Sequence, residues 1–414
     1  MTHFRSATLV VALTAAVPLF AQTQPRLIGV ATNPALAAAQ NLRQDMATCL
    51  TKVCTVPLPP PPTPNAGGTA YDASLAAVWE TTGLIIGLFD PNTCAPICPP
   101  FPISPLINNN VATGLALNES TRTLWVSDNT NRIYQFGRAV TAPCNLIPIT
   151  SCPTPFIPAG MTIGGLATSD VQNLVYYSAS VFGGGPPNNI VYIANQNTPC
   201  APICKFPLQG CGPVALGPIT GLAYDDCKGV MWATDGFTEV AVIVGPPNCV
   251  PNVVQCCQVP GPERYIGLCI QPSQAVPTGV SCTAPPCPIC PTMTHNTIGD
   301  PALGNPFFAL TLDNAPAGVP SLLCINAGAC LAAGIPIPPF CGPLRVALPG
   351  IITLGFPTGG GVGCSGQVTV GVPVPLNPAL CGIPLSSQFL VVCPTAALVG
   401  TGVSNCLSWM VSGT

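Results

Sequence analysis

The sequence predicts an all-β protein, in which a disulfide-rich β-propeller of five or six blades precedes a β-sandwich. Three observations lead to this fold class: a repeated spacing between glycine and aromatic residues, short alternating hydrophobic runs, and cysteines that recur in close pairs. In four units a glycine is followed eleven positions later by a large aromatic residue. These pairs are Gly68 with Trp79, Gly114 with Trp125, Gly165 with Tyr176, and Gly221 with Trp232.

The repeat has the length of a propeller blade. Successive glycines of the four pairs are 46, 51 and 56 positions apart (114−68, 165−114 and 221−165), an interval close to one four-stranded blade. Within 114–137, three hydrophobic runs are separated by polar turns at 118–121 and 128–131, as half-buried antiparallel strands require. The Cys- and Pro-rich tail of each unit is then the fourth strand, because an edge strand tolerates proline.

The fixed position of the aromatic residue predicts its role. Trp79, Trp125, Tyr176 and Trp232 would stack on sugar rings if they were exposed, but each stands within an apolar strand. We therefore expect the four aromatic side chains to pack between blades.

One repeat carries a family resemblance. Residues 114–137 open with Gly-Leu-Ala, continue with Trp-Val-Ser-Asp and end with Asn-Arg-Ile-Tyr-Gln-Phe, and this unit resembles the repeats of NHL-type β-propellers. The resemblance extends over about 65–260. The resemblance implies a propeller fold that binds a ligand, because propellers of this kind include both enzymes and binding scaffolds. The matching residues are Gly114, Leu115, Ala116, Trp125, Val126, Asp128, Asn131, Arg132, Ile133 and Phe136.

Two weaker blade openings flank the four units, at 28–31 and at 266–269. Neither has an aromatic residue eleven positions after its glycine, although each is followed by a Cys- and Pro-rich tail. Either the two fragments form two thin blades, which gives six, or they combine into one closing blade, which gives five. Both alternatives close the ring and remove its open edges.

The N-terminus predicts export. Residues 1–21 contain Arg5, an apolar run over 7–20 and the small residue Ala21, which is the pattern of a secretory signal peptide. We expect a secreted protein, located in the periplasm, on the cell surface or in the medium, with no membrane span. Charged residues make up 6% of the chain and the net charge is −3, so the sequence offers no electrostatic footprint for nucleic acid.

The chain has 24 cysteines, all after the predicted signal, and in an oxidising compartment they predict disulfides. Close cysteine pairs also ligate zinc, but each blade carries one pair and the mature chain has one histidine. A local disulfide within each tail is therefore our interpretation, with a longer-range pair such as Cys211 with Cys227. The candidates are Cys49, Cys54, Cys94, Cys98, Cys144, Cys152, Cys200, Cys204, Cys211, Cys227, Cys249 and Cys256.

No catalytic residue is assigned from the sequence. The acidic residues of the repeats stand at equivalent turns, where a carboxylate commonly accepts backbone N–H bonds and fixes the turn. The alternative is a calcium or sugar-lactone site at the channel mouth, for which Asp72, Asp225 and Asp235 are weak metal candidates, and it requires these carboxylates to converge. The acidic residues concerned are Asp72, Glu80, Glu119, Asp128, Asp225, Asp226 and Asp235.

The sequence changes character after His295. The propeller is predicted over 22–291 and a β-sandwich over 292–414, where new alternating runs begin and charges become rare. Its seven cysteines are an odd number, so at least one must pair with the propeller, pair between chains or stay free. The stretch 299–312 resembles a tail module of secreted proteins of environmental bacteria.

The function predicted from these features is that of a non-enzymatic binding or scaffold protein outside the cytoplasm. Its propeller would bind an unidentified protein or glycan, and its C-terminal module would serve tethering or sorting. Two alternatives stay open: a metal-dependent propeller hydrolase or lactonase that uses channel carboxylates, and a structural component of the cell envelope. No cofactor is predicted for the binding scaffold. Calcium is the cofactor that the hydrolase or lactonase alternative would use.

Overall fold

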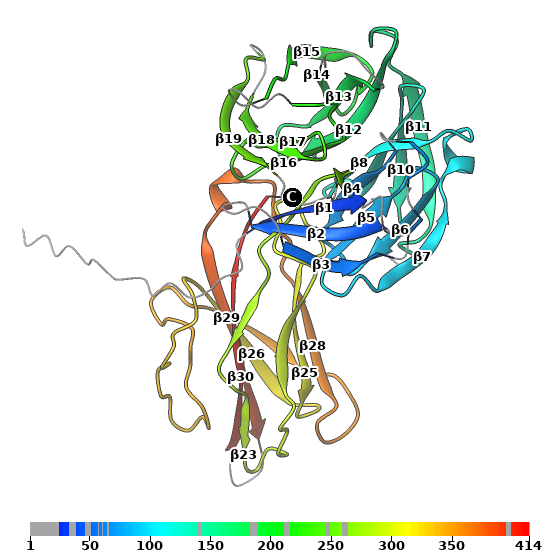
Figure 1. Ribbon diagram of the computed structural model, residues 1–414. Coiled ribbons are helices and arrows are strands. Elements are labelled where there is room, and N and C mark those ends of the chain that lie inside the picture. The colour runs from blue at the N-terminus through cyan, green and yellow to red at the C-terminus, as the bar shows by residue number, and fades with distance from the viewer. Residues whose placement is uncertain are drawn as a thin grey trace, which may run out of the picture.

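The structure is a computed structural model that describes residues 25–32, 39–45, 51–56, 58–59, 61–63, 66–139, 142–182, 189–210, 216–244, 249–258, 264–394 and 399–413. The predicted signal segment and the candidate cysteines Cys49 and Cys211 lie outside these residues. The protein is all-β, with a propeller at one end and a sandwich at the other (Figure 1). No helix in the described part of the chain is long and apolar enough to cross a membrane.

Four blades of the propeller follow the glycine–aromatic repeat, each as four antiparallel strands in chain order. The blades are β4 (Gly68–Asp72), β5 (Ala77–Thr81), β6 (Ile85–Phe89) and β7 (Pro96–Pro102); β8 (Ala112–Asn118), β9 (Thr123–Asp128), β10 (Arg132–Arg138) and β11 (Leu146–Pro153); β12 (Met161–Ser169), β13 (Leu174–Val181), β14 (Ile190–Asn195) and β15 (Pro202–Pro207); and β16 (Gly221–Asp225), β17 (Val230–Thr234), β18 (Thr238–Ile243) and β19 (Asn252–Gln258). The Cys- and Pro-rich tails are the outer strands.

The remaining blade joins the two ends of the ring. Its strands are β1 (Arg26–Thr32), β2 (Ala39–Asp45) and β3 (Thr51–Thr55), and β1 pairs on its inner side with β20 (Arg264–Tyr265) and β21 (Cys269–Gln271). The two weak sequence fragments therefore combine into one closing blade. The described strands form five blades, which are numbered here from the closing blade as blade 1. The NHL type and the resemblance of the tail module stay predictions.

The repeated glycine is explained by the space at the centre of the ring. A Cβ atom on Gly68 would lie 2.5 Å from Leu115 N, and one on Gly165 would lie 2.8 Å from Leu222 N. On Gly267, in the closing blade, it would lie 2.6 Å from Thr69 N. Gly114 and Gly221 meet the next blade in the same way. The inner strands thus approach too closely for any side chain at this level, and five glycines form a ring around the axis.

The aromatic residues of the repeat lie in the cores between neighbouring blades. Trp79 is buried among side chains of blades 2 and 3, and Trp125 among those of blades 3 and 4. Tyr176 lies between blades 4 and 5, and Trp232 between blade 5 and the closing blade. Each is at most 3% exposed, so none is available to stack on a sugar.

Disulfides connect neighbouring blades, and the prediction of a local bond within each tail is wrong. Within the described part of the chain, four bonds of this kind are seen: Cys54–Cys94, Cys98–Cys144, Cys152–Cys200 and Cys204–Cys249. Each joins the outer strand of one blade to the turn before the outer strand of the next, over Cα separations of 5.4 to 6.2 Å. Within a tail, Cys94 and Cys98 are four residues apart, as are Cys200 and Cys204. Along an extended strand this spacing separates the two Cα atoms by roughly 13 Å, which is too far for a disulfide. Cys256 is also disulfide-bonded.

The sandwich has two sheets. The first contains β22 (Val276–Thr278), β23 (Cys282–Ala284), β26 (Pro320–Ala327), β27 (Ile352–Pro357), β29 (Pro384–Pro394) and β30 (Val399–Met410), and the second contains β24 (Thr294–Ile298), β25 (Ala309–Ala315) and β28 (Gly366–Gly371). Because β22 and β23 pair with β30, residues 276–284 belong to this module. This corrects the predicted boundary between 291 and 292.

The structure accounts for the seven cysteines in 292–414 by bonds within the sandwich, a bond to the propeller and a free thiol. Cys381 pairs with Cys227 of the propeller, which also corrects the suggested pair of Cys227 with Cys211. Cys324 is a buried free thiol, as is Cys269 in the closing blade. The other bonds of this module are Cys282–Cys341, Cys287–Cys393, Cys290–Cys364 and Cys330–Cys406.

Candidate functional site

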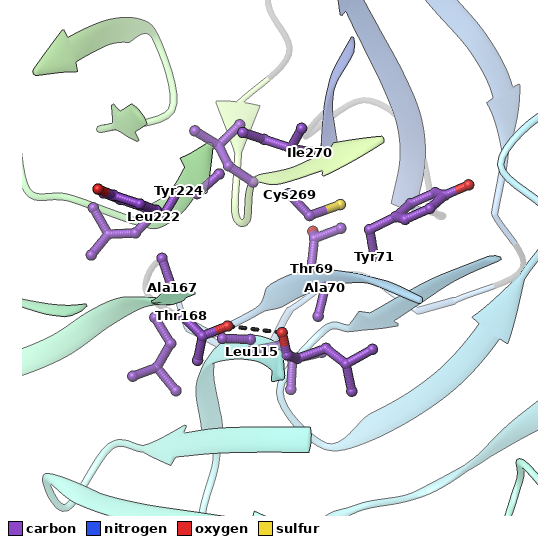
Figure 2. A pocket seen from close by; sticks show the side chains of 15 residues that line it. Thr69, Ala70, Tyr71, Leu115, Ala167, Thr168, Leu222, Tyr224, Cys269 and Ile270 are labelled. Atoms are coloured by element: carbon purple, nitrogen blue, oxygen red, sulfur yellow. Dashed lines mark hydrogen bonds between the residues drawn. The ribbon is translucent and has the colours of Figure 1, made fainter. Parts of the chain in front are cut away.

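The central channel is the first place where a propeller would hold a ligand. Figure 2 shows side chains of the inner strands β4, β8, β12, β16 and β21 around it, with Thr168 Oγ1 donating to Leu117 O at 2.8 Å. The cavity has a volume of about 30 Å³, which is room for one or two water molecules. A sugar or lactone ring does not fit, because the glycine ring holds the inner strands together.

The sandwich covers the channel mouth at which the inner strands end. Asp300 N donates to Ala73 O at 2.7 Å, and Ser273 N donates to Ser412 Oγ at 2.8 Å. The C-terminus reaches this mouth (Figure 1), where a Cβ atom on Gly413 would lie 2.6 Å from Asp225 Oδ1. The side chains at this covered mouth are therefore buried between the two modules.

The predicted metal candidates fix turns. Asp72 Oδ1 accepts from Ser74 Oγ at 2.7 Å, and Asp225 Oδ1 accepts from the backbone N–H groups of residues 227 and 228 at 2.9 and 3.1 Å. Both lie at the covered mouth. Asp235 lies at the other end of its blade, where Oδ1 accepts from the N–H groups of residues 237 and 238 at 2.8 and 2.7 Å. Asp128 Oδ1 accepts from the N–H groups of 130 and 132 in the equivalent turn.

These carboxylates do not converge on one cavity. Asp72 and Asp225 are separated from Asp235 by the length of a blade, and all three accept hydrogen bonds of their own turns. Among the residues that the structure describes, no three His, Cys, Asp or Glu side chains lie close enough together to hold a metal ion.

A second set of carboxylates links consecutive blades at the covered mouth. Glu119 accepts from the backbone N–H of Ala73, and Asp170 Oδ2 accepts from Ser120 N at 3.0 Å. Asp226 Oδ2 accepts from Asp170 N at 2.9 Å. Each bond runs from one blade to the blade before it. Asp170 was not among the candidates from the sequence, although it follows Ser169 just as Glu119 follows Asn118 and Asp226 follows Asp225.

The covered mouth also holds a buried ion pair that the sequence analysis missed. Arg138, at the end of β10, places Nε 2.7 Å from Asp72 Oδ2 and Nη2 2.9 Å from Asp72 Oδ1. Burial raises the pKa of Asp72, and the Arg138 guanidinium opposes that rise. Burial also raises the pKa of Glu119 well above its ordinary value, and the charge on Asp72 adds to that effect. Arg138 thus balances two acidic groups in the interior.

His295, the one histidine of the predicted mature chain, lies in β24 of the sandwich and is fully buried. Its Nδ1 is 2.8 Å from Thr311 O and its Nε2 is 2.9 Å from Ser387 Oγ. Burial lowers the pKa of His295 to about 4. The histidine therefore belongs to the core of the second module and not to the channel.

The far mouth of the propeller presents a different surface. It is built from the turns at 82–84, 129–131 and 235–237 and from the connections 103–111 and 154–160. Its exposed residues include Asn108 and Asn109 between blades 2 and 3 and Asn129 in the turn between β9 and β10, together with Leu84 and Phe237, which are 41% and 49% exposed. This surface, termed the far face below, combines amide groups with apolar side chains.

The buried carboxyls predict a protein that becomes less stable as the pH rises from 5 to 8. Burial raises the pKa of Glu80 to about 8, of Asp170 and Asp300 to about 7, and of Asp226 to about 6. Because these folded-state values exceed the unfolded ones, the stabilising contribution is complete below about pH 4 and is lost as the pH rises through the folded values. His295 acts in the opposite sense below about pH 6.5.

We expect urea denaturation to show a fall of at least about 2 kcal/mol in the free energy of unfolding between pH 5 and pH 8. In Asp300→Asn this fall should be smaller, because one of the titrating groups is gone. A free energy that is constant or rises over this range would contradict the assignment of these groups as buried acids.

Comparison with known proteins identifies no family for this chain. No protein-family model matches the sequence, and no curated protein is similar to it. The β-propeller domain of Cps50 (Swd1) from Myceliophteria thermophila is 10% identical, with a TM-score of 0.31, over 55% of this chain and 66% of that chain, just under two thirds of its length. A putative 6-phosphogluconolactonase from Bacteroides uniformis is 14% identical, with a TM-score of 0.32, over 57% of this chain and 83% of that one. A protein from Lactobacillus plantarum is 10% identical, with a TM-score of 0.31, over 91% and 94%. Similarity at this level says nothing about activity, and the propeller rests on its own sheet topology.

Proposed function

We propose that this protein is an exported, non-enzymatic binding scaffold whose far face binds a neutral glycan. The observation that carries the proposal is the closure of the channel together with its covered mouth. The glycine ring leaves about 30 Å³ inside the channel, and the sandwich buries the carboxylates at one end. Binding is therefore assigned to the opposite end of the ring, which the second module leaves exposed to solvent.

The chemistry of the far face favours an uncharged ligand. Asn108 Nδ2 donates to Tyr134 Oη at 3.2 Å and Asn129 Oδ1 accepts from Val111 N at 3.1 Å. Each amide has further donor and acceptor positions for sugar hydroxyls, and the exposed amide of Asn109 adds a third such group. The ring of Phe237 is 49% exposed and has the Arg264 guanidinium carbon 5.9 Å from its centroid, and its exposed part offers an apolar surface for the C–H face of a sugar. The carboxylates nearest to this face, Asp128 and Asp235, already accept bonds of their own turns.

The dense disulfides fit an extracellular scaffold, and the predicted export signal supports that location. The alternative of a metal-dependent hydrolase or lactonase needs ligands from several blades that meet in a cavity large enough for substrate. Its candidates Asp72, Asp225 and Asp235 stand in turns at two different mouths. The binding scaffold is therefore the function that the geometry supports best.

The proposal is tested on an array of neutral polysaccharides with the mature protein as the probe. We expect binding that is insensitive to salt and that falls at least about tenfold in Phe237→Ala and in Asn109→Gly. Glycine is chosen because Asn109 has a left-handed backbone with φ of 60°. Asn197→Gly, an exposed asparagine in a turn at the other end of blade 4, is the matched control and should bind as the wild type does.

Absence of binding to every neutral glycan would overturn the proposed ligand class. Binding that survives both far-face substitutions would overturn the proposed surface. Stoichiometric calcium or zinc in the dialysed protein, measured by elemental analysis, would favour the metal-dependent alternative instead.

A further inference from the structure

The five outer strands of the propeller are protected against pairing with other chains. In every blade, the pairing between the third strand and the outer strand contains a register shift. Prolines stand within β7, β11 and β15, and a lysine stands in β15. Bulges, prolines and lysines are the devices by which native proteins keep edge strands from associating.

Two edges of the sandwich are covered by the chain itself. His295 N donates to Asn405 Oδ1 at 2.8 Å and His295 O accepts from Asn405 Nδ2 at 2.9 Å, which covers the backbone of β24. On β28, Gly359 N donates to Gln367 O at 2.8 Å and Gln367 N donates back at 3.2 Å. The edge at β22 is three residues long and contains Pro277.

Strand β27 differs from all of these edges. Its six residues pair with β26 in an unbroken register from Pro320↔Pro357 to Ile325↔Ile352. It has no charged residue, and its one proline is at its end. Ile352 is 59% exposed and Leu354 is 40% exposed. This edge is therefore flat, apolar and free of the features that protect the blades.

The exposed side chains of β27 point to the inner side of the sandwich. Leu354 stands directly opposite Leu323, which is fully buried in the core, so both project from the same face of the sheet. Ile352 projects from that face as well, opposite Ile325. The exposure of Ile352 and Leu354 shows that the three-stranded second sheet does not cover this part of the first. The strand thus offers both an open backbone edge and an apolar strip.

The charge of the module indicates what would cover this strip. After Asp313 the chain contains a single charged residue, Arg345. A charged partner would lose hydration at β27 without gaining a counter-charge, whereas a second copy brings an equally neutral apolar strand. Antiparallel pairing of identical strands about a two-fold axis is self-complementary. We propose that β27 pairs with β27 of a second copy, so that one continuous sheet crosses a homodimer.

The test is sedimentation equilibrium of the mature protein with two matched variants. We expect a dimer, and we expect Ile352→Lys to raise its dissociation constant at least about tenfold, because each lysine would place a charge without a counter-charge against the partner's apolar strand. Ile149→Lys is the control: Ile149 is 57% exposed on β11, which is one of the protected outer strands, and this variant should dimerise like the wild type. Circular dichroism checks that both variants are folded.

Two results would overturn the proposal. One is a wild-type protein that stays monomeric at about 100 µM, since association weaker than this is not specific pairing. The other is a dimer whose dissociation constant Ile352→Lys leaves unchanged, whatever the effect of Ile149→Lys. Glycan binding at the far face is measured on a different module, so either proposal fails without the other.

Discussion

Replacement of Arg138 by methionine is expected to lower the free energy of unfolding by about 3–5 kcal/mol. Asp72 and Arg138 have fully buried side chains, and Glu119 is buried beside them. Without the guanidinium, one or both acids must either stay charged in the interior or take up a proton. The loss therefore arises from the uncompensated acids and not from the missing contact alone.

The same substitution elsewhere on the strand provides the control. Arg132 is also on β10, but its guanidinium is partly exposed, with Nη2 3.2 Å from Ser151 Oγ, so Arg132→Met should cost about 1 kcal/mol or less. Thermal and urea denaturation of both variants give the comparison. Equal losses in the two variants would show that Arg138 has no special role at the covered mouth.

Removal of the disulfide between the modules is the second large effect we expect. Cys227 and Cys381 are 154 residues apart, and in the chain-entropy model closure of a loop of this length contributes about 5 kcal/mol. In Cys227→Ala/Cys381→Ala we expect a loss of about 2–5 kcal/mol and two thermal transitions in place of one, because the covered mouth then depends on hydrogen bonds and packing.

Calorimetry detects the two transitions, and hydrogen exchange of residues 225–227 and 411–413 reports opening of the contact. Cys282→Ala/Cys341→Ala is the matched control, because that bond lies within the sandwich and spans 59 residues. It should destabilise the sandwich without separating the modules. A single unchanged transition in the Cys227 and Cys381 variant would mean that the bond does not hold the two modules together.

The propeller was predictable because its key residues act locally. Gly68 is in β4 and Trp79 is in β5, and these two strands form one hairpin. The eleven-residue spacing between them is therefore set by the length of that hairpin. The closing blade was harder, since β1 and β21 meet only after the ring is complete. For that reason the sequence alone was compatible with five blades and with six.

Long-range pairing accounts for what the sequence could not predict. Arg138 lies 66 residues from Asp72, and no local pattern marks the two as partners. The prediction of local disulfides was wrong for a related reason. The partner of Cys98 is decided by which blade stands next to β7, and not by the nearest cysteine in the chain. The signal for Asp170 was present, because its position recurs in three blades, but it becomes visible only when the repeats are aligned strand by strand.

The order of cysteines has a consequence for how the chain is oxidised as it is made. Cys54 and Cys94 are consecutive cysteines, as are Cys98 and Cys144, and Cys152 and Cys200. An oxidant that joins cysteines in their order of emergence makes these three native bonds directly. Eleven cysteines lie between Cys227 and Cys381, so that bond must wait until the chain is almost complete. Correction of mispaired thiols by an isomerase therefore matters most for the second module and for its attachment to the first.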